Sequence, residues 1–478
     1  MKTPTTPSHT FDQQQLLVIN SRSKKILDEL VKPDGIFASN DSLWNGQYHH
    51  YFGRDSAITA MLINEAEKIS KNYALSPIAL KALIAISRFQ GQKNDITTGE
   101  VSGKIPHEIN TSLPGVAQMK ERMHKNGNKA WFIDETDGYL KNWDSVDSTP
   151  LWIIAIVQYI QDGWDVPPEI YDVIAKAASW CIDNIKEFGG YTGWMPAEYQ
   201  PDRLFGGLTN QAWKDSQAAF EYEKGSRAVY PVHDIFSNAA TWAALKYCSK
   251  ILLSYDPKLA GEAERAAVGL KWRLNKTKLG FRIKKGDFFA EALDGKLQKL
   301  TTPSIDVGMA MAMDFNDRSV IYKIYQRNLV DKLMSQEFFN EELGLRTYTQ
   351  NIHSYTIDDQ YHRGPQTFWP FTGALVAKGF NTLGFKKEAR KILKSLLMGL
   401  NDFDSFVELF QLKGDRVALW KDSNSPQTSS LNQAWTAAAA YYASSFLLKP
   451  TKSKREMLSI RKYANLKLPK AIIDKISE

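Results

Sequence analysis

Two carboxyl side chains of this sequence have apolar neighbours: Glu408 is embedded in an apolar run, where a negative charge is costly, and Asp215 lies near a tryptophan. Glu408 is the acid within "FVELF", and Asp215 follows Trp213 in "NQAWKDS". A carboxylate in such surroundings needs an ion partner or a chemical task, and an apolar wall raises the pKa of a carboxyl. One protonated and one ionised carboxyl are the minimum equipment for hydrolysing a glycosidic bond. The alternatives are a structural ion pair for Glu408 and an ordinary surface acid for Asp215.

The stretch "YHRGPQTFWPF" (361–371) has the composition expected of a sugar-binding wall. It is too polar for a core strand and too apolar for a solvent loop. The ring faces of a sugar stack on aromatic side chains, whereas its hydroxyl groups need fixed donors and acceptors. We therefore expect His362, Arg363 and Trp369 to contact a carbohydrate.

A second polar and aromatic motif, "YFGRDSAITAML", leads into a predicted helix. Arg54 and Asp55 stand side by side in it, and the rings of Tyr51 and Phe52 precede them. Charged groups beside aromatic rings suit a grip on sugar hydroxyls. The alternative is that Asp55 or Ser56 only caps the helix.

Two further motifs add candidates for the same site. In "NWDSVDSTPLW" (142–152), Asp147 precedes a typical helix start and leaves one carboxylate free to face a pocket. Trp435 in "LNQAW" (431–435) opens a helix rich in alanine and tyrosine. We include Trp143, Trp213 and Trp435 among the residues expected to contact the sugar.

Composition excludes several classes of protein. The 478 residues are 43% hydrophobic and 24% charged, which is typical of a folded globular chain. No run of about 18 apolar residues and no signal-peptide core occurs, so we expect a cytoplasmic protein. The two cysteines, Cys181 and Cys248, are expected to be buried free thiols. The eight His are scattered without metal-ligand spacing, so we expect no metal and no cofactor, and no nucleic-acid or membrane partner.

The elements that must position these residues are predicted to be mostly helical. Apolar residues recur at helical spacing in a dozen segments, and strand-like alternation is confined to short pieces such as 280–285. The expected helices are 12–31, 55–72, 76–90, 150–161, 168–187, 234–254, 258–274, 304–313, 318–336, 371–382, 386–400 and 432–447. Chemically rich loops separate them at 41–54, 91–147, 190–232, 337–370 and 402–431. This alternation predicts an all-α fold, a six-hairpin (α/α)6 toroid whose loops form a central pocket.

The toroid also explains how two distant carboxyls could meet. Asp215 and Glu408 lie far apart in the sequence, and a closed ring of helices would bring them face to face. A helical solenoid is the structural alternative, but the sequence shows no repeat of fixed period. We expect an N-terminal helical lead-in (1–40), the catalytic domain (41–449) and a basic C-terminal helical extension (450–478).

Taken together, these motifs resemble the glucosidase domain of glycogen-debranching enzymes, the amylo-α-1,6-glucosidases. More loosely they resemble the glucoamylase, trehalase and processing α-glucosidase families on α/α barrels. The motifs occur in the same order as in the debranching-enzyme family: "FGRDS", "SVDSTPLW", "LTNQAWKDS", "GLRT", "YHRGPQTFWPF", "FVELF" and "NQAW". The resemblance implies an inverting hydrolase with Asp215 as general acid and Glu408 as general base. It also implies that Arg54, Asp55 and Asp147 grip the sugar.

The implied reaction is a single displacement. Glu408 would activate a water while Asp215 protonates the departing oxygen, and this chemistry requires about 6.5–9.5 Å between the two carboxyls. The motif departs from the family at Lys214, whose charge would lower the pKa of Asp215 unless it points away. The expected substrate is an α-1,6-linked glucoside, or a small α-glucoside such as a disaccharide or a glucosylated osmolyte.

Three other functions remain open from the sequence. An inverting phosphorylase on the same barrel would use phosphate in place of water, and Glu408 argues against it. A sugar epimerase would need a pair of histidines in the pocket, for which His233 and His362 are the candidates. A carbohydrate-binding protein without catalytic activity is the third.

Overall fold

A computed structural model describes residues 11–32, 35–40, 50–125, 129–222, 225–284, 288–349, 360–364, 366–422 and 427–448. The predicted basic extension (450–478) therefore lies outside the described residues. Within them the chain is rich in helix, which confirms the prediction of a mostly helical protein. Fourteen α-helices occur in this part of the chain: α1 (Gln13–Leu30), α2 (Gly53–Ser70), α3 (Ser76–Ser87), α4 (Leu113–Lys125), α5 (Ser148–Gln161), α6 (Glu169–Glu187), α7 (Ile235–Ile251), α8 (Pro257–Leu274), α9 (Asp306–Ala312), α10 (Lys323–Leu333), α11 (Gln360–Arg363), α12 (Pro370–Thr382), α13 (Lys386–Leu400) and α14 (Ala434–Leu447).

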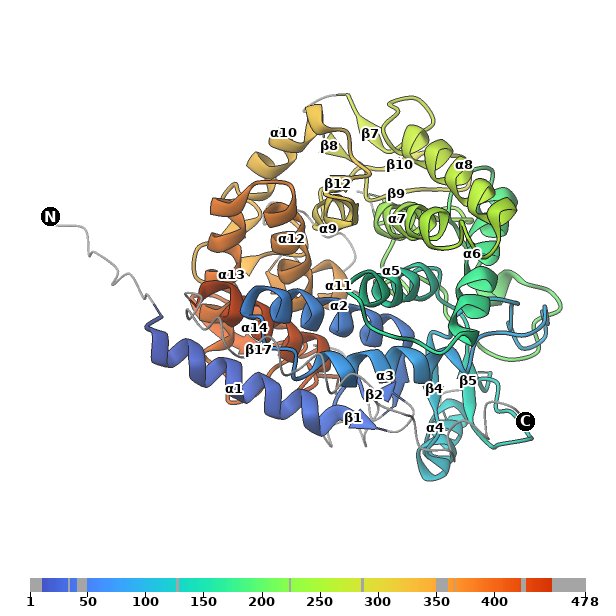
Figure 1. Ribbon diagram of the computed structural model, residues 1–478, viewed down its shortest axis with the longest axis horizontal. Helices are drawn as coiled ribbons and strands as arrows, with labels where there is room; N and C mark the ends of the chain where they lie inside the picture. Colours follow the sequence, from blue (N-terminus) through green and yellow to red (C-terminus); the bar gives the residue numbers. More distant parts are fainter. Residues whose placement is uncertain are drawn as a thin grey trace, which may run out of the picture.

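Six of these helices pack in a closed series. Helix α2 packs on α5, α5 on α7, α7 on α9, α9 on α12, α12 on α14, and α14 returns to α2. Figure 1 shows them near the middle of the molecule, with α1, α3, α6, α8, α10 and α13 outside them. The sequences of the inner helices explain their place, because nearly every residue of α5, α7, α12 and α14 is buried. A helix without a broad polar face is stable only when it is buried.

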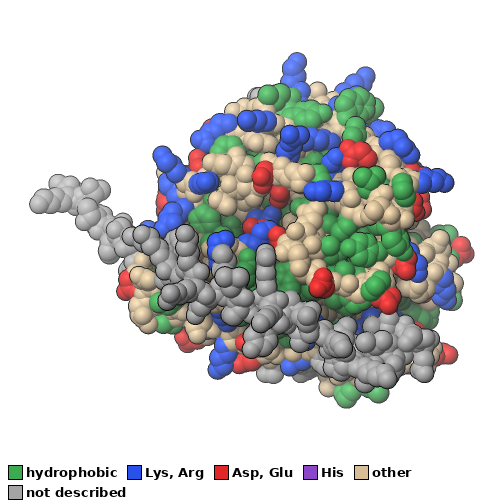
Figure 2. Space-filling view, viewed as in Figure 1, with side chains coloured by type: hydrophobic (Ala, Val, Ile, Leu, Met, Phe, Trp, Pro, Cys, Tyr) green, Lys and Arg blue, Asp and Glu red, His purple; other side chains and the backbone are tan. Residues whose placement is uncertain are grey.

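The outer helices are amphipathic and cover the inner series. Helix α13 buries Ala389, Ile392, Leu393 and Leu396 on one face, and its lysines lie on the other. Helix α1 packs on α14, α3 on α2, α6 on α5 and α7, α8 on α7, α10 on α9, and α13 on α12 and α14. Figure 2 shows many Lys and Arg side chains along the rim of the molecule, where these outer helices lie. Each inner helix therefore has at least one outer partner, and of these α3 is the least charged, with Lys81 as its single charged residue.

Short antiparallel strands connect the loops that precede the inner helices in the sequence. Three sheets have three strands each, in the orders β3-β4-β5, β6-β9-β10 and β15-β16-β17. Each sheet links the loops that lead into two inner helices: α2 with α5, α7 with α9, and α12 with α14. Their bounds are β3 (Tyr51–Phe52), β4 (Glu108–Asn110), β5 (Leu140–Asn142), β6 (His233–Asp234), β9 (Ala292–Leu293), β10 (Lys299–Leu300), β15 (Thr367–Phe368), β16 (Phe410–Lys413) and β17 (Arg416–Leu419).

Four smaller pairs of strands complete the described sheets. They are β1 (Val31–Lys32) with β2 (Gly35–Ile36), β7 (Arg282–Ile283) with β8 (Phe288–Phe289), β11 (Asp314–Phe315) with β12 (Arg318–Ser319), and β13 (Phe339–Asn340) with β14 (Gly344–Leu345). Strand β7 lies within 280–285, where the sequence predicted a short strand, and its partner β8 lies beyond that stretch. The strand β12 replaces the start of the helix predicted at 318–336, so α10 begins only at Lys323.

Helix α4 was not predicted, because it lies inside the stretch 91–147 that was expected to be a loop. Its Pro114 is in the first turn, where proline costs no hydrogen bond. Val116 and Met119 form a small separate cluster with Leu140. The helix therefore packs on one of the loop sheets and not on the main core, which is why its apolar face is short.

Two expectations about single features can be compared with the structure. Cys181 and Cys248 are both buried and free, as predicted. Within the described residues, no helix is both long and apolar enough to cross a membrane.

A close approach between two inner helices gives a testable prediction. A Cβ atom on Gly379 of α12 would lie 2.3 Å from Cα and 2.5 Å from Cβ of Ala312 in α9, whereas a Cβ on Gly269 of α8 meets nothing within 4 Å. We expect Gly379→Ala to lower the free energy of unfolding by about 1–3 kcal/mol. The control Gly269→Ala should raise it by up to about 1 kcal/mol, because alanine is the better helix former.

Thermal unfolding followed by circular dichroism measures both variants. Equal or higher stability of Gly379→Ala would show that α9 and α12 do not pack at this distance.

Candidate active site

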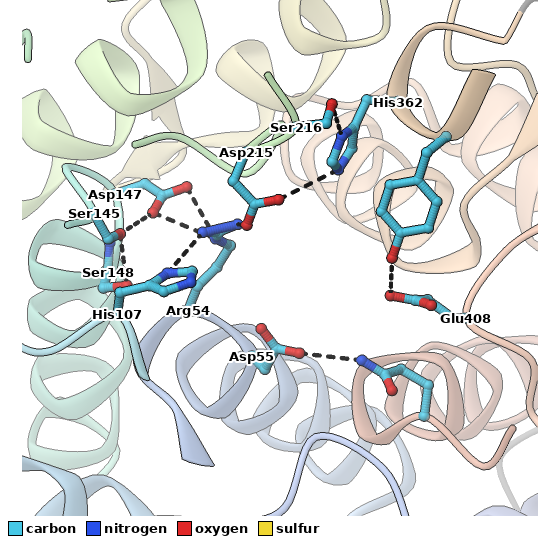
Figure 3. A network of polar contacts seen from close by, with 12 residues as sticks. Arg54, Asp55, His107, Ser145, Asp147, Ser148, Asp215, Ser216, His362 and Glu408 are labelled. Atoms are coloured by element: carbon cyan, nitrogen blue, oxygen red, sulfur yellow. Dashed lines mark hydrogen bonds and ion pairs between the residues drawn. The ribbon is translucent and has the colours of Figure 1, made fainter. Parts of the chain in front are cut away.

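The candidate catalytic and binding residues gather near the N-termini of the inner helices. Arg54 and Asp55 lie in the first turn of α2, and Asp147 directly precedes α5. Asp215 comes from the loop before α7, and Glu408 comes from the loop before α14. Figure 3 shows Asp215 and Glu408 on opposite sides of a space, with Asp55 below it.

Arg54 links three of these elements. Its Nε lies 3.1 Å from Oδ2 of Asp147, and its Nη1 lies 3.4 Å from Oδ2 of Asp215. Its Nη2 lies 3.3 Å from Nδ1 of His107. Burial alone would lower the pKa of Arg54, but the surrounding carboxylates raise it, so the guanidinium stays charged. Burial and the Arg54 charge hold the pKa of His107 well below its usual value, so this imidazole is neutral.

Asp55 does not cap α2, which corrects one alternative considered for this motif. The helix begins at Gly53, earlier than predicted, and its N-cap residue Phe52 makes no side-chain cap hydrogen bond. Ser56 is also inside the helix. The carboxyl of Asp55 instead accepts a hydrogen bond of 3.2 Å from Nε2 of Gln433. Burial and the neighbouring carboxylates raise the pKa of Asp55 to about 8.

Asp215 is the most accessible of the site carboxyls, with 31% of its side chain exposed. Burial raises its pKa to about 7 against the opposing effect of Arg54. The neighbouring Lys214 does not oppose this shift, because its side chain points away and is fully buried. Lys214 Nζ lies 2.7 Å from Glu291 and 2.5 Å from Asp306. The condition that the sequence placed on Lys214 is therefore met.

Glu408 is buried and held from two sides. The Tyr361 hydroxyl donates to its Oε1 at 2.5 Å, and the backbone N–H of Ser430 donates to its Oε2 at 3.2 Å. The pKa of Glu408 is raised to about 7. Burial is the main cause and the charge of Asp215 adds to it, whereas the two hydrogen bonds act in the opposite direction. The ion pair considered as an alternative for Glu408 is not among its contacts within the described residues.

Aromatic rings form one wall beside the two carboxyls. His362 stacks on Trp369 with ring centroids 5.4 Å apart and an interplanar angle of 8°, and Trp213 packs edge-on against both rings. Nε2 of His362 lies 3.9 Å from Asp215, and its Nδ1 lies 2.7 Å from Oγ of Ser216. Trp435 stacks on Phe371 and packs edge-on against Trp369, so it stands behind this wall.

Four predicted site residues have mainly structural contacts. Trp143 donates to the carbonyl of Phe89 at 3.2 Å. Arg363 pairs with Glu221 at 3.5 Å. Tyr51 packs against Phe37, and Phe52 packs against His50 and His107. These rings and charges support the loops around the site, and Phe52 packs against His107, which contacts Arg54.

The sequence did not single out three residues that the structure places in the cluster. Tyr361 lies in "YHRGPQTFWPF" and Gln433 lies in "NQAW", so both were inside quoted motifs without being given a role. His107 had no sequence signal, because it follows Pro106 in a long loop and reaches Arg54 only through the pairing of β3 with β4. In the described part of the chain, no group of three or more His, Cys, Asp or Glu could hold a metal ion.

Comparison with known proteins identifies the fold class. No protein-family model and no curated protein matches the sequence. The structure is similar to that of the GH63 mannosylglycerate hydrolase from Thermus thermophilus in complex with Tris and D-glycerate. The TM-score is 0.55 and the identity 12%, over 89% of this chain and 99% of that chain.

A structure described as a wild-type glycosidase is also similar, with a TM-score of 0.54 and 10% identity. The match covers 92% of this chain and 100% of that chain. At these identities the likeness shows a shared fold. The fold is the helix-rich one of these two glycoside hydrolases.

The hydrogen bond from Tyr361 gives a prediction that is independent of any activity. Tyr361→Phe removes the donor that lowers the pKa of Glu408, so that pKa should rise by about one unit or more. Carboxyl ¹³C NMR, assigned with Glu408→Gln, measures it. The control is Tyr442→Phe, because the buried hydroxyl of Tyr442 has no hydrogen-bond partner among the described residues. A pKa of Glu408 that is the same in both variants would contradict the contact.

Proposed function

We propose that the protein is an inverting glycoside hydrolase that cleaves an α-linked glucoside. The observation that carries the proposal is the pair of facing carboxyls, Asp215 and Glu408, with Asp55 below the space between them and Arg54 behind Asp215 (Figure 3). The fold shared with glycoside hydrolases and the motif resemblance support it. We also propose that the closed helix series with its outer partners is an (α/α)6 toroid.

In the proposed mechanism, Asp215 is the general acid and Glu408 the general base. A pKa of about 7 keeps a large fraction of Asp215 protonated near neutral pH, as an acid requires. Glu408 acts as its anion, which the hydrogen bonds from Tyr361 and Ser430 stabilise. Glu408 removes a proton from a water that attacks the anomeric carbon, and Asp215 protonates the departing oxygen. Arg54, Asp55, His362 and Trp369 hold the sugar, while the fully buried Asp147 fixes Arg54 and the buried Trp213 supports the rings of His362 and Trp369.

The charge around the site favours a neutral substrate. Asp55, Asp147, Asp215 and Glu408 surround Arg54, whose guanidinium is already bound to Asp147 and Asp215. The stretches 350–359 and 423–426, which adjoin the loops of Tyr361 and Glu408 in the sequence, contain no Lys or Arg. With Asp55 and Asp215 protonated, the charges of Asp147 and the ionised Glu408 still outweigh that of Arg54, so an anionic aglycone would meet a net negative field. We therefore favour an α-1,6-linked glucoside, a disaccharide or a neutral glucosylated osmolyte over a glycoside of glyceric acid.

The competing functions fit the geometry less well. A phosphorylase needs no base, yet Glu408 is buried and hydrogen-bonded at the site. An epimerase would need His233 beside His362, but His233 contacts Thr192, Tyr191 and Phe188. A binding protein without catalysis would not need both carboxyls.

The wider expectations from the sequence are part of the proposal. They are a catalytic domain at 41–449, a helical lead-in before it and a basic extension after it. They also include a cytoplasmic location, action without metal or cofactor, and a small-molecule or oligosaccharide substrate with no nucleic-acid or membrane partner.

A panel of substrates tests the proposal. Isomaltose, trehalose and glucosylglycerol represent neutral α-glucosides, and glucosylglycerate and mannosylglycerate represent anionic ones. We expect glucose release from at least one neutral member and a lower kcat/KM on the anionic members. Asp215→Asn and Glu408→Gln should each lower kcat by about 10²–10⁴-fold, because each swap removes one proton transfer and keeps the shape.

The matched control is Asp234→Asn, which makes the same change at a buried acid before α7. Asparagine can still cap that helix, so turnover should be retained. Full activity of either site variant would refute the assigned roles. A preference for the anionic members would refute the neutral substrate class.

A further inference from the structure

A single buried carboxylate holds the two residues that precede Asp215. Asp306, in the first turn of the inner helix α9, accepts a hydrogen bond of 2.5 Å from Nε1 of Trp213 through its Oδ1. Its Oδ2 lies 2.5 Å from Nζ of Lys214 and accepts a hydrogen bond of 3.0 Å from Ser304. Asp306 is only 1% exposed, so it cannot contact a substrate directly.

The surroundings of Lys214 explain why this carboxylate is needed. Lys214 is fully buried, and its Nζ also lies 2.7 Å from Glu291 and from the Tyr348 hydroxyl. Burial alone would lower the pKa of Lys214, but Asp306 and Glu291 hold it well above its usual value. A permanent cation therefore lies one residue from Asp215, and its position depends on these carboxylates.

The geometry fixes the direction in which the chain continues. Trp213 and Lys214 both point toward the start of α9, and Asp215 turns the other way, toward Arg54 and His362. We propose that Asp306 is a positioning residue for Asp215: it anchors Trp213 and Lys214 so that the Asp215 carboxyl faces the site while the Lys214 charge faces away. The role concerns the acid half of the proposed hydrolysis, so it rests on the function proposed above.

Removal of the Asp306 charge has a consequence with a definite sign. In Asp306→Asn, Lys214 keeps one carboxylate partner in place of two, so the local field becomes more positive. A more positive field favours the ionised form of Asp215, and its pKa falls. The groups that already face Asp215 are Arg54, Asp55, Glu108, Asp147, His362 and Glu408, and the variant leaves all of them in place.

The leaving group of the substrate separates a positioning role from a merely structural one. A glucoside with a poor leaving group needs the proton of Asp215, whereas α-glucosyl fluoride needs far less help. We expect Asp306→Asn to lose about tenfold or more in kcat on the poor leaving group, little on the fluoride, and to show little change in KM. The basic limb of the pH profile should move to lower pH, because the acid loses its proton earlier.

Asp314→Asn is the matched control. Asp314 forms an ion pair with the buried Lys378 at 2.9 Å, away from Asp215. This variant should therefore lose stability, and any change in its kcat should not depend on the leaving group. If Asp306→Asn does not fold, Ser304→Ala loosens the same carboxylate and should show the same trend to a smaller degree. Equal loss on both substrates, or no loss, would overturn the proposal.

A second readout does not depend on hydrolysis. Carboxyl ¹³C NMR, assigned with Asp215→Asn, gives the pKa of Asp215 in wild type and in Asp306→Asn. We expect a lower pKa in the variant, and an unchanged pKa would overturn the proposal. If the wild type cleaves no glycoside but the pKa falls, the proposed function fails while the positioning role stands.

Discussion

The arrangement of the site depends on the buried guanidinium of Arg54. It is bound to Asp147 and Asp215 and touches His107, so it joins α2, the start of α5 and the loop before α7. Four carboxyls gathered in a buried space would repel one another without a central cation. Arg54 offsets part of this repulsion, and burial, with a smaller contribution from the remaining repulsion, raises the pKa values of Asp55, Asp215 and Glu408.

The rest of the fold gives these charges fixed positions. Helices α2, α5 and α14 begin at the same end of the series. The contacts of Arg54 with Asp147 and of Gln433 with Asp55, which join their N-terminal ends, show this. Partial positive charge at helix N-termini favours carboxylates there. The three small sheets then tie the long loops in pairs, so that a residue such as Glu408 is held by local structure despite lying outside a helix.

Periodicity revealed the inner helices and local composition revealed the carboxyls, but neither could give the contacts between distant segments. Glu408 was recognisable because an acid among apolar residues is unusual, whereas Asp215 was marked only by the nearby Trp213 and by the family resemblance. His107 was not, because its contact with Arg54 arises from a strand pairing between distant loops. The direction of Lys214 was likewise undetermined until Asp306, 92 positions further along, was placed beside it. Helix α4 was missed because its apolar face serves a small separate cluster.

The central claim is that a water placed between two facing carboxyls attacks the sugar opposite the leaving group. ¹H NMR of the first glucose released from an α-glucoside tests it directly, because the anomeric proton distinguishes the two products before they interconvert. Attack with inversion gives β-glucose as the first product, which is the result this account predicts. α-Glucose as the first product would mean that a covalent intermediate forms, and it would contradict the roles given to Asp215 and Glu408.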